Sequence, residues 1–302
     1  MQKFKITNNA ALELISNKQI NINKLELLAS QTRNGRVKVL KDKISKIIFL
    51  DKNLASVSYY KNNYKKEFKK KKFTGKYYGK KIITPRLDDN KRYISYVENF
   101  LKNKKILDFG CGDGGFLNLC KNKAKELYGI EISQQNIDFI KENYSFINIV
   151  KDIDNLNNKF DIVTLFHTYH YLDQPLRSLK KIFHSLKKKG KIIIEIPNAN
   201  DLLLSKLNLE SFKKFTFCKE NLIWHTENSL KFGLKKVGFK KINIFFKQRY
   251  NINNHLCWIL LGKPGGHKIM SQMVKSSSAK KKYEDFLIRN KISDTLVAFA
   301  EK

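Results

Sequence analysis

The chain has 302 residues, 42% of them apolar and 12% aromatic, which is enough to bury a full hydrophobic core, so we expect one main domain with appendages. Its formal net charge of +33 comes mostly from lysines in separate runs. These runs lack the interleaved arginine and aromatic pattern of an RNA-binding platform, so we favour a solvated basic surface and expect no specific nucleic-acid partner.

Other compartments and site types are disfavoured by what the sequence lacks. It contains no signal-peptide core and no apolar run near the ~18 residues of a membrane span. The four cysteines include no C-x-x-C pair. We therefore expect a cytoplasmic protein with reduced thiols, no membrane span and no metal site.

The first predicted unit is an N-terminal segment, residues 1–85. Asn34-Gly35 is a turn signal, and the stretches at 36–42 and 45–51 alternate polar and apolar residues as in a small hairpin. A Tyr-rich stretch at 55–68 then has a helical pattern. We expect this segment to form an appendage beside the main domain.

A glycine-rich turn follows a predicted buried strand, Ile106–Phe109, and leads directly into a short predicted helix. Gly110, Gly112 and Gly115 also match the dinucleotide fingerprint, in which glycines bring a pyrophosphate to a helix N-terminus. Asp108, two residues ahead of the first glycine, would repel a phosphate there. It suits a cationic ligand, such as the sulfonium and ammonium groups of S-adenosylmethionine.

Beyond this turn, short β-rich runs alternate with amphipathic helices, the pattern of βαβ units in a parallel sheet with helices on both faces. The predicted helices cover 116–120, 134–143 and 176–186, and a fourth has Thr226 as its N-cap and Gly238 just past its end. The predicted strands after the first end near Glu131, Asp152, Phe166 and Ile196, with two more at 240–248 and 294–301. That makes seven strands, the last two an antiparallel edge pair. Two insertions, about 199–223 and 250–290, interrupt the later strands at the sheet edge where ligands bind.

These motifs, over about 92–302, resemble those of the class I S-adenosylmethionine-dependent methyltransferases. The resemblance implies a seven-stranded, doubly wound, Rossmann-like α/β fold over residues 86–302, with S-adenosylmethionine as cofactor. In the family, LDFGCGDGG would hold the methionine moiety, GIEIS the ribose and VKDID the adenine, while FDIVTLFHTYHYLDQP would form the floor of the methyl-transfer site. The cofactor residues it implies are Asp108, Gly110, Cys111, Gly112, Gly114, Glu131, Ile132, Asp152, Ile153, Phe166 and His167.

A finer resemblance concerns the acceptor. IIIEIPNANDLL, WHTENSLKFGLKKVGF and QRYNINNHLCWILLGKPGGH are similar to stretches of bacterial methyltransferases that accompany surface-glycan and sugar biosynthesis. It implies a small acceptor, a sugar, nucleotide-sugar or phosphate-bearing glycan precursor. Relatives have a cysteine-bearing ribbon where this chain reads KDKISKIIFLDKNLASVSYY, so the N-terminal segment is expected to act as a lid without zinc.

A general base is needed only if the acceptor is a hydroxyl, an acidic carbon or a protonated amine, because the methyl group is already activated by the sulfonium. His170 is the preferred base candidate, followed by His167 and Glu195. The alternatives are a hydrogen bond to the loop before Pro175 for His170, a wall beside the adenosine or methionine for His167, and a cap on the neighbouring loop for Glu195. The side chains expected to bind the acceptor are Asn198, His225, Arg249, Tyr250 and His255. The stretch NHLCWILLG could equally be an amphipathic helix packed on the core.

Other functions stay open. The charge motivates an RNA methyltransferase, although the D/N-P-P-Y/F tetrad and a Pro-Cys nucleophile are both missing. The apolar insertions leave room for a quinone precursor as acceptor. A non-catalytic S-adenosylmethionine-binding protein is the alternative outside enzymes.

Overall fold

A computed structural model describes residues 4–55, 87–154, 156–157 and 159–302. The rest of the predicted Tyr-rich helix, from residue 56 onward, lies outside these ranges, as does the lysine run at 65–72. In the described part of the chain, no helix is long and apolar enough to cross a membrane.

The centre of the molecule is a seven-stranded sheet with the order β10-β11-β8-β7-β4-β5-β6. Its strands are β4 (Lys105–Phe109), β5 (Glu126–Ile130), β6 (Ile147–Val150), β7 (Phe160–Phe166), β8 (Leu186–Pro197), β10 (Lys240–Lys247) and β11 (Thr295–Glu301). β4 to β8 pair in parallel, whereas β11 is antiparallel to both β8 and β10. The predicted seven-stranded α/β fold and its final antiparallel pair are confirmed.

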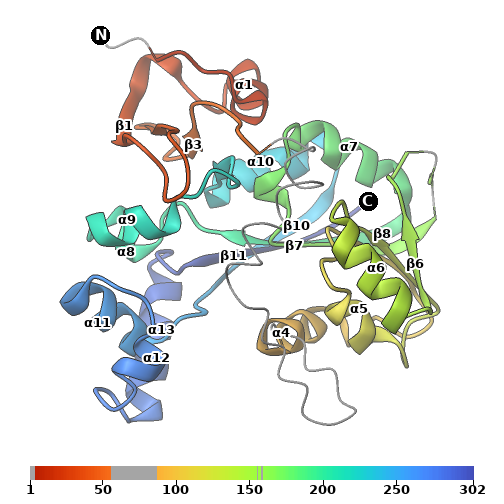
Figure 1. Cartoon of the computed structure of the whole chain (residues 1–302). Coiled ribbons are helices and arrows are strands. Elements are labelled where there is room, and N and C mark those ends of the chain that lie inside the picture. The colour runs from red at the N-terminus through yellow and green to blue at the C-terminus, as the bar shows by residue number, and fades with distance from the viewer. Residues whose placement is uncertain (1–3, 56–86, 155, 158) are drawn as a thin grey trace.

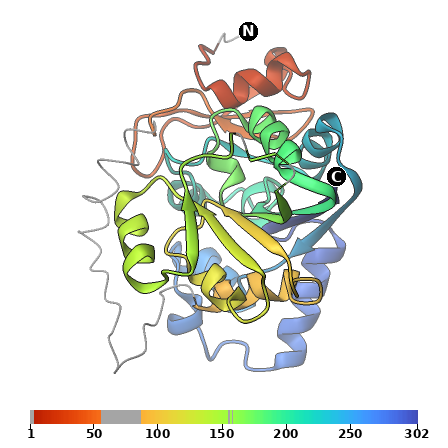
Figure 2. The same ribbon diagram turned by 90° about the vertical axis from the view of Figure 1, so that its right-hand side faces the viewer.

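Helices cover both faces of this sheet (Figure 2). One face packs against α4 (Leu87–Val97), α5 (Gly115–Cys120) and α6 (Gln134–Asn143), and the other against α7 (Pro175–Ser185) and α10 (Glu227–Val237). Because successive side chains of a strand point to opposite faces, neighbouring residues enter different cores. Ile106 belongs to the core that contains Val97 of α4, whereas Leu107 belongs to the core that contains Leu179 of α7.

The caps of α10 show how local sequence sets an element's ends. The Thr226 hydroxyl accepts from the backbone N–H of Ser229, whose own hydroxyl accepts from the N–H of Thr226, a reciprocal capping box. Gly238 ends the helix in the left-handed conformation with φ 110°. Both caps lie where the sequence predicts them.

The N-terminal segment forms a second, smaller sheet (Figure 1). After α1 (Asn9–Ser16) and a 3-10 turn η1 (Ile22–Lys24), β1 (Leu25–Ala29), β2 (Val39–Asp42) and β3 (Ile48–Leu50) pair antiparallel, which includes the predicted hairpin. Its fourth strand is β9 (Ile223–Trp224), from the end of the first insertion. The segment is thus built into the main domain through a strand 170 or more residues away in the chain.

The two insertions are helical. The first holds α8 (Leu202–Ser205) and α9 (Glu210–Thr216), and the second holds α11 (Ile252–Leu261), α12 (Gly266–Ile269) and α13 (Ser277–Arg289). Figure 1 shows α11 to α13 gathered at one end of the molecule, beyond β10 and β11.

Candidate active site

The glycine loop after β4 is folded back onto the end of β5. The N–H groups of Gly110 and Cys111 both donate to the carbonyl of Ile130, at 2.8 and 3.0 Å. Gly110 and Gly112 have φ values of 84° and 56°, which L side chains rarely adopt. A Cβ at Gly110 would overlap the Thr168 side chain, whereas one at Gly112 would meet no atom within 4 Å. The loop therefore borders open space at Gly112, which fits a ligand held close to the backbone.

The buried carboxylate of Asp108 lies at the end of β4, next to this loop. Its Oδ1 accepts a 2.7 Å hydrogen bond from the Thr164 hydroxyl of β7. Burial raises the pKa of Asp108 to about 7; Thr164 opposes the rise, and the nearby Glu131 carboxylate adds to it. Since an approaching cation would favour the ionised form, the site fits the cationic end of S-adenosylmethionine.

Glu131, directly after β5, is held by the backbone. One carboxylate oxygen accepts from the N–H of Gly112 at 2.9 Å, and the other from Ile132 and Ser133 at 2.8 and 2.7 Å. Burial raises its pKa, although these N–H groups lower it. The carboxylate thus bridges the glycine loop and the end of β5. The family resemblance implies a residue at this position that binds the ribose of the cofactor.

The remaining cofactor candidates divide between open and buried positions. Asp152 is exposed after β6 and accepts from the N–H of Asp154 at 3.0 Å, while Ile132 is 39% exposed and Ile153 buried. Cys111 turns its thiol away from the open side, because its sulfur fills the space above Gly129. Gly114 is the left-handed N-cap of α5. Asp152 and Ile132 are available to a ligand, and Cys111 offers only its backbone.

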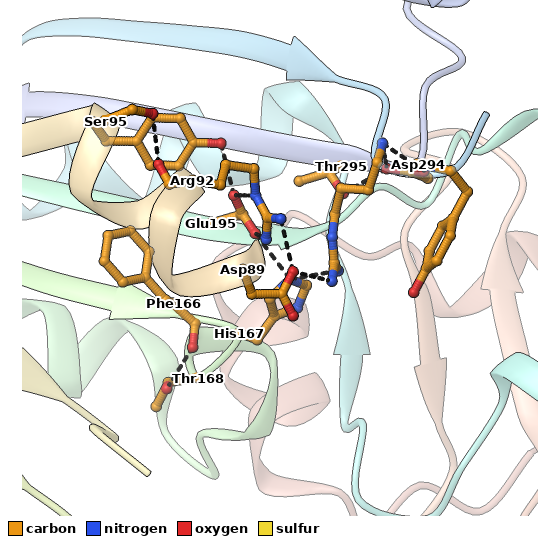
Figure 3. A network of polar contacts seen from close by, with 12 residues as sticks. Asp89, Arg92, Ser95, Phe166, His167, Thr168, Glu195, Asp294 and Thr295 are labelled. Atoms are coloured by element: carbon orange, nitrogen blue, oxygen red, sulfur yellow. Dashed lines mark hydrogen bonds and ion pairs between the residues drawn. The ribbon is translucent and has the colours of Figure 1, made fainter. Parts of the chain in front are cut away.

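A network of charged groups surrounds Glu195, at the end of β8 (Figure 3). Its side chain is fully buried and accepts from Arg92 Nε and Nη2 at 3.0 and 2.7 Å and from the Tyr96 hydroxyl at 2.8 Å. His167 Nε2 lies 3.0 Å from its Oε1. Although burial alone would raise the pKa of Glu195, these partners hold it well below its ordinary value, so the carboxylate is ionised.

The network continues to Arg249, which follows β10. Its guanidinium contacts His167 Nε2 at 2.8 Å and donates to Asp89 of α4 at 2.9 Å, and Asp89 also accepts from Arg92 at 2.7 Å. Burial lowers the pKa of His167; Glu195 opposes this effect and Arg249 adds to it. Two arginines and two carboxylates therefore balance in charge around a neutral histidine.

This network adjoins the glycine loop. Phe166, the last residue of β7, stacks on Tyr93 of α4 with ring centroids 4.1 Å apart. His167 has a φ of 52°, and the next residue, Thr168, touches Gly110 of the glycine loop. The ends of β4, β7 and β8 thus bring the glycine loop, His167 and Glu195 to one place, as the sequence predicts for residues at strand ends.

Sequence reasoning missed the contribution of α4. Asp89, Arg92 and Tyr96 hold the centre of the network, yet none was a predicted site residue. The stretch LDDNKRYISYV places them three and four residues apart on one helix face, a spacing that was the only available indication.

Two other predicted residues are held in structural hydrogen bonds, and a third lies beside the network. Asn198 donates to the carbonyl of Ser293 at 2.8 Å, and His255 contacts the Tyr283 hydroxyl at 2.8 Å and Gln248 at 3.2 Å, so both are buried in structural hydrogen bonds. Tyr250 is half-exposed, with the guanidinium carbon of Arg249 5.5 Å from its ring centre.

Two predicted histidines are buried but incompletely bonded. Within the described residues, His170 Nδ1 and His225 Nε2 have no hydrogen-bond partner. His170, in the 3-10 turn η2 (Tyr169–Tyr171), packs edge-on against His167 at 5.8 Å, and His225 stacks on Tyr169 at 5.0 Å. Burial holds the pKa of both histidines below the ordinary value, to about 3 for His225, so both are neutral. Over the described ranges, no three His, Cys, Asp or Glu residues are grouped so that they could hold a metal ion.

The sequence profile of a family described as "Methyltransferase domain" matches residues 81–244. A tRNA U34 carboxymethyltransferase of Helicobacter pylori strain J99 is 25% identical over 158 residues, covering 48% of this chain and 59% of that protein. The putative methyltransferase 235L of invertebrate iridescent virus 6 is 26% identical over 185 residues, covering 54% and 69%. The crystal structure of a SAM-dependent methyltransferase from Archaeoglobus fulgidus is similar with a TM-score of 0.50 and 26% identity, covering 72% of this chain and 94% of that one. The chain spans less than two thirds of the length of the Helicobacter protein that it matches.

Proposed function

We propose, because the chain belongs to the methyltransferase-domain family and has S-adenosylmethionine as its cofactor, that it methylates a small polar acceptor, a sugar, nucleotide-sugar or other phosphate-bearing glycan precursor. A cytoplasmic location is part of this proposal. The N-terminal segment and the two insertions would border the acceptor.

The observation that supports this acceptor class most directly is the Arg249–His167–Glu195 cluster beside the glycine loop. Thr168 joins the two parts, because it follows His167 and touches Gly110. Guanidinium groups and a neutral imidazole offer directed hydrogen bonds to hydroxyl or phosphate oxygens in a largely buried setting. An apolar acceptor could not replace the contacts that Arg249 makes with His167 and Asp89, so it would gain no hydrogen bond from this cluster.

Each of the chain's own residues has a role in this proposal. When bound, S-adenosylmethionine supplies a methyl group activated by the positive sulfur. Asp108 would face its cationic end, Glu131 its ribose hydroxyls and Asp152 its adenine. Orientation then provides most of the acceleration, since holding two reactants in alignment can lower the barrier by roughly 7–11 kcal/mol.

The experiment that tests this proposal is incubation of the protein with methyl-labelled S-adenosylmethionine and a metabolite-plus-RNA extract, followed by separation into polar, lipid and RNA fractions. Label in the polar fraction is the expected result. Asp108→Ala and Glu131→Ala variants, which lose cofactor contacts, report the background. Label in lipid would instead identify a quinone-type acceptor, and bound cofactor without any transfer would identify a binding protein.

A second candidate is an RNA methyltransferase. It is favoured by the similarity to a protein named as a tRNA U34 carboxymethyltransferase and by the net charge of +33. RNA binding alone would not decide between the candidates, because lysines bind phosphates without regard to sequence and with steep salt dependence. Label transferred into RNA would establish this candidate and overturn the first.

A further inference from the structure

His167 Nε2 lies between two groups that make opposite demands on it. Nη1 of Arg249 is 2.8 Å away, and Oε1 of Glu195 is 3.0 Å away. A guanidinium can only donate a hydrogen bond, and an ionised carboxylate can only accept one. Nε2 accepts when it has no proton and donates when it has one, so it satisfies either Arg249 or Glu195 but never both.

The surrounding contacts favour Arg249 in the structure as it stands. Its guanidinium donates a 2.9 Å hydrogen bond to Asp89, and its contact with His167 is shorter than the contact between Glu195 and His167. Glu195 does not depend on His167, because Arg92 and Tyr96 already supply three donors to its carboxylate. Nε2 of a neutral His167 then accepts from Arg249, and the ring proton lies on Nδ1.

That tautomer cannot act as a base toward an acceptor. The contacts of the ring with Arg249 and Glu195 both involve Nε2, which leaves Nδ1 as the nitrogen through which His167 would take a proton from an acceptor. While it holds the proton it has no free electron pair. If the proton lay on Nε2, the N–H would donate to Glu195 and the Nδ1 electron pair would be free, the arrangement in which a carboxylate orients a histidine base.

We propose that Arg249 is a latch that holds His167 in the unreactive tautomer until an anionic group of the acceptor, a phosphate or carboxylate, draws the guanidinium away. The inference rests on the proposed function and adds to it that the acceptor is anionic. Arg249 is a positioning residue: when the anionic group of the acceptor binds Arg249, His167 becomes able to act as a base. Solvent exchange then moves the ring proton from Nδ1 to Nε2, where Glu195 accepts it.

The chemical step balances with these groups alone. The acceptor's hydroxyl oxygen or amine nitrogen forms a bond to the methyl carbon while the carbon–sulfur bond breaks, and sulfur keeps the electron pair. The acceptor's proton passes to Nδ1 of His167. The resulting imidazolium is stabilised by Glu195 at Nε2, and it returns its proton to water after the product leaves.

The charges that face His167 come from every neighbouring element: Asp89 and Arg92 of α4, Glu195 of β8 and Arg249 after β10, with the neutral His170 of η2 against its edge. Burial and Arg249 lower the His167 pKa, and Glu195 and Asp89 raise it. Loss of Arg249 therefore has two effects that a purely structural role would not produce. The His167 pKa rises, and the proton of the neutral ring moves to Nε2.

The test is nitrogen-15 NMR of the full chain with labelled histidine, in which protonated and unprotonated ring nitrogens are distinguished directly. A His167→Gln spectrum assigns its signals among the six histidines. In the wild-type protein we expect the Nδ1–H tautomer, and in Arg249→Gln the Nε2–H tautomer with a raised pKa. Arg289→Gln, which removes one exposed arginine elsewhere, is the matched control and should leave the His167 signals unchanged.

Inorganic phosphate is the probe for the anion. Added to the wild-type protein at constant ionic strength, it should move His167 toward the Nε2–H tautomer, and it should have no further effect on Arg249→Gln. An Nε2–H tautomer in the wild-type protein without phosphate would overturn the latch. An unchanged wild-type spectrum with phosphate would overturn the anion trigger, even if the variant failed to fold. Neither readout needs an acceptor or turnover, so failure here is distinct from failure of the proposed function.

Discussion

The Thr164 hydroxyl of β7 donates a 2.7 Å hydrogen bond to the Asp108 carboxylate on the neighbouring strand β4. Both side chains are buried, and the bond supports the ionised form of a carboxyl whose pKa burial raises to about 7. The charge that Asp108 would offer to a cationic cofactor therefore depends on a residue outside the glycine motif.

Thr164→Val should weaken S-adenosylmethionine binding by roughly ten- to a hundredfold near pH 7, because a hydrogen bond to a charged group contributes about 1.5–3 kcal/mol. The loss should shrink toward pH 9, where Asp108 ionises without help. Calorimetric titration across this range checks both statements. Asp108→Asn is the control, since it should remove the part of the pH dependence that comes from this carboxyl.

The raised pKa of Asp108 predicts opposite pH trends for the stability of the cofactor-free protein and for cofactor binding. The folded-state pKa of Asp108, about 7, lies above its unfolded value. Its contribution to the stability of the cofactor-free protein is therefore present at low pH and lost as the pH rises through about 7, while cofactor affinity increases over the same interval. Parallel trends in denaturant unfolding and in cofactor binding would contradict this assignment.

Gly110→Ala and Gly112→Ala should separate folding from binding. Both positions have positive φ, at a cost of roughly 1–2 kcal/mol for alanine. Only at Gly110 does the added methyl group also overlap Thr168, so that variant should unfold at a markedly lower temperature. Gly112→Ala should fold, yet bind S-adenosylmethionine poorly, because its methyl group enters the open side of the loop. Wild-type affinity in Gly112→Ala would place the cofactor elsewhere.

Arg92→Met should destabilise the protein by roughly 3–5 kcal/mol, because it leaves the buried Glu195 carboxylate short of partners. Tyr96→Phe removes one donor but leaves the ion pair, so about 1–3 kcal/mol is expected. Urea unfolding at neutral pH compares the two. Since Arg92 helps hold the Glu195 pKa below its unfolded value, the stability it supplies should disappear as the pH falls through the acid range. Equal effects of the two variants would show that the ion pair is not central.

Trp224→Ala and Phe49→Ala should each cost roughly 3–5 kcal/mol, because both side chains are fully buried in the core that joins the N-terminal sheet to the main domain. Removal of residues 1–55 should then leave the main domain unable to fold stably. Thermal unfolding of the variants and cofactor binding by the truncated chain measure this. A truncated chain that bound S-adenosylmethionine normally would mean that the segment is a detachable lid.

The order of strands and helices in the main domain could be predicted from the sequence, because each element has its own local pattern. Runs of apolar residues such as IIIEI mark strands covered on both faces, and the Thr226 and Gly238 caps delimit a helix within the chain itself. The glycine loop and the acidic residues at strand ends were predictable for the same reason: strand ends in a parallel sheet meet at one edge.

Contacts between distant polar residues depended on the tertiary structure. Arg92 and Glu195 are 103 positions apart, and Arg249 and His167 are 82 apart, and no periodicity relates them. The same holds for β9, two residues long, which is recognisable as a strand only because β3 lies beside it.

The sequence alone predicts the order of the strands and the positions of the glycines and carboxylates at their ends, since each depends on local backbone geometry. Which polar residues come together beside the glycine loop was decided only in three dimensions. His255 and Asn198 are chemically as suitable as Arg249, but packing commits them to structural hydrogen bonds. Burial and pairing are properties of the folded chain, and they separate a site residue from one of the same type in the core.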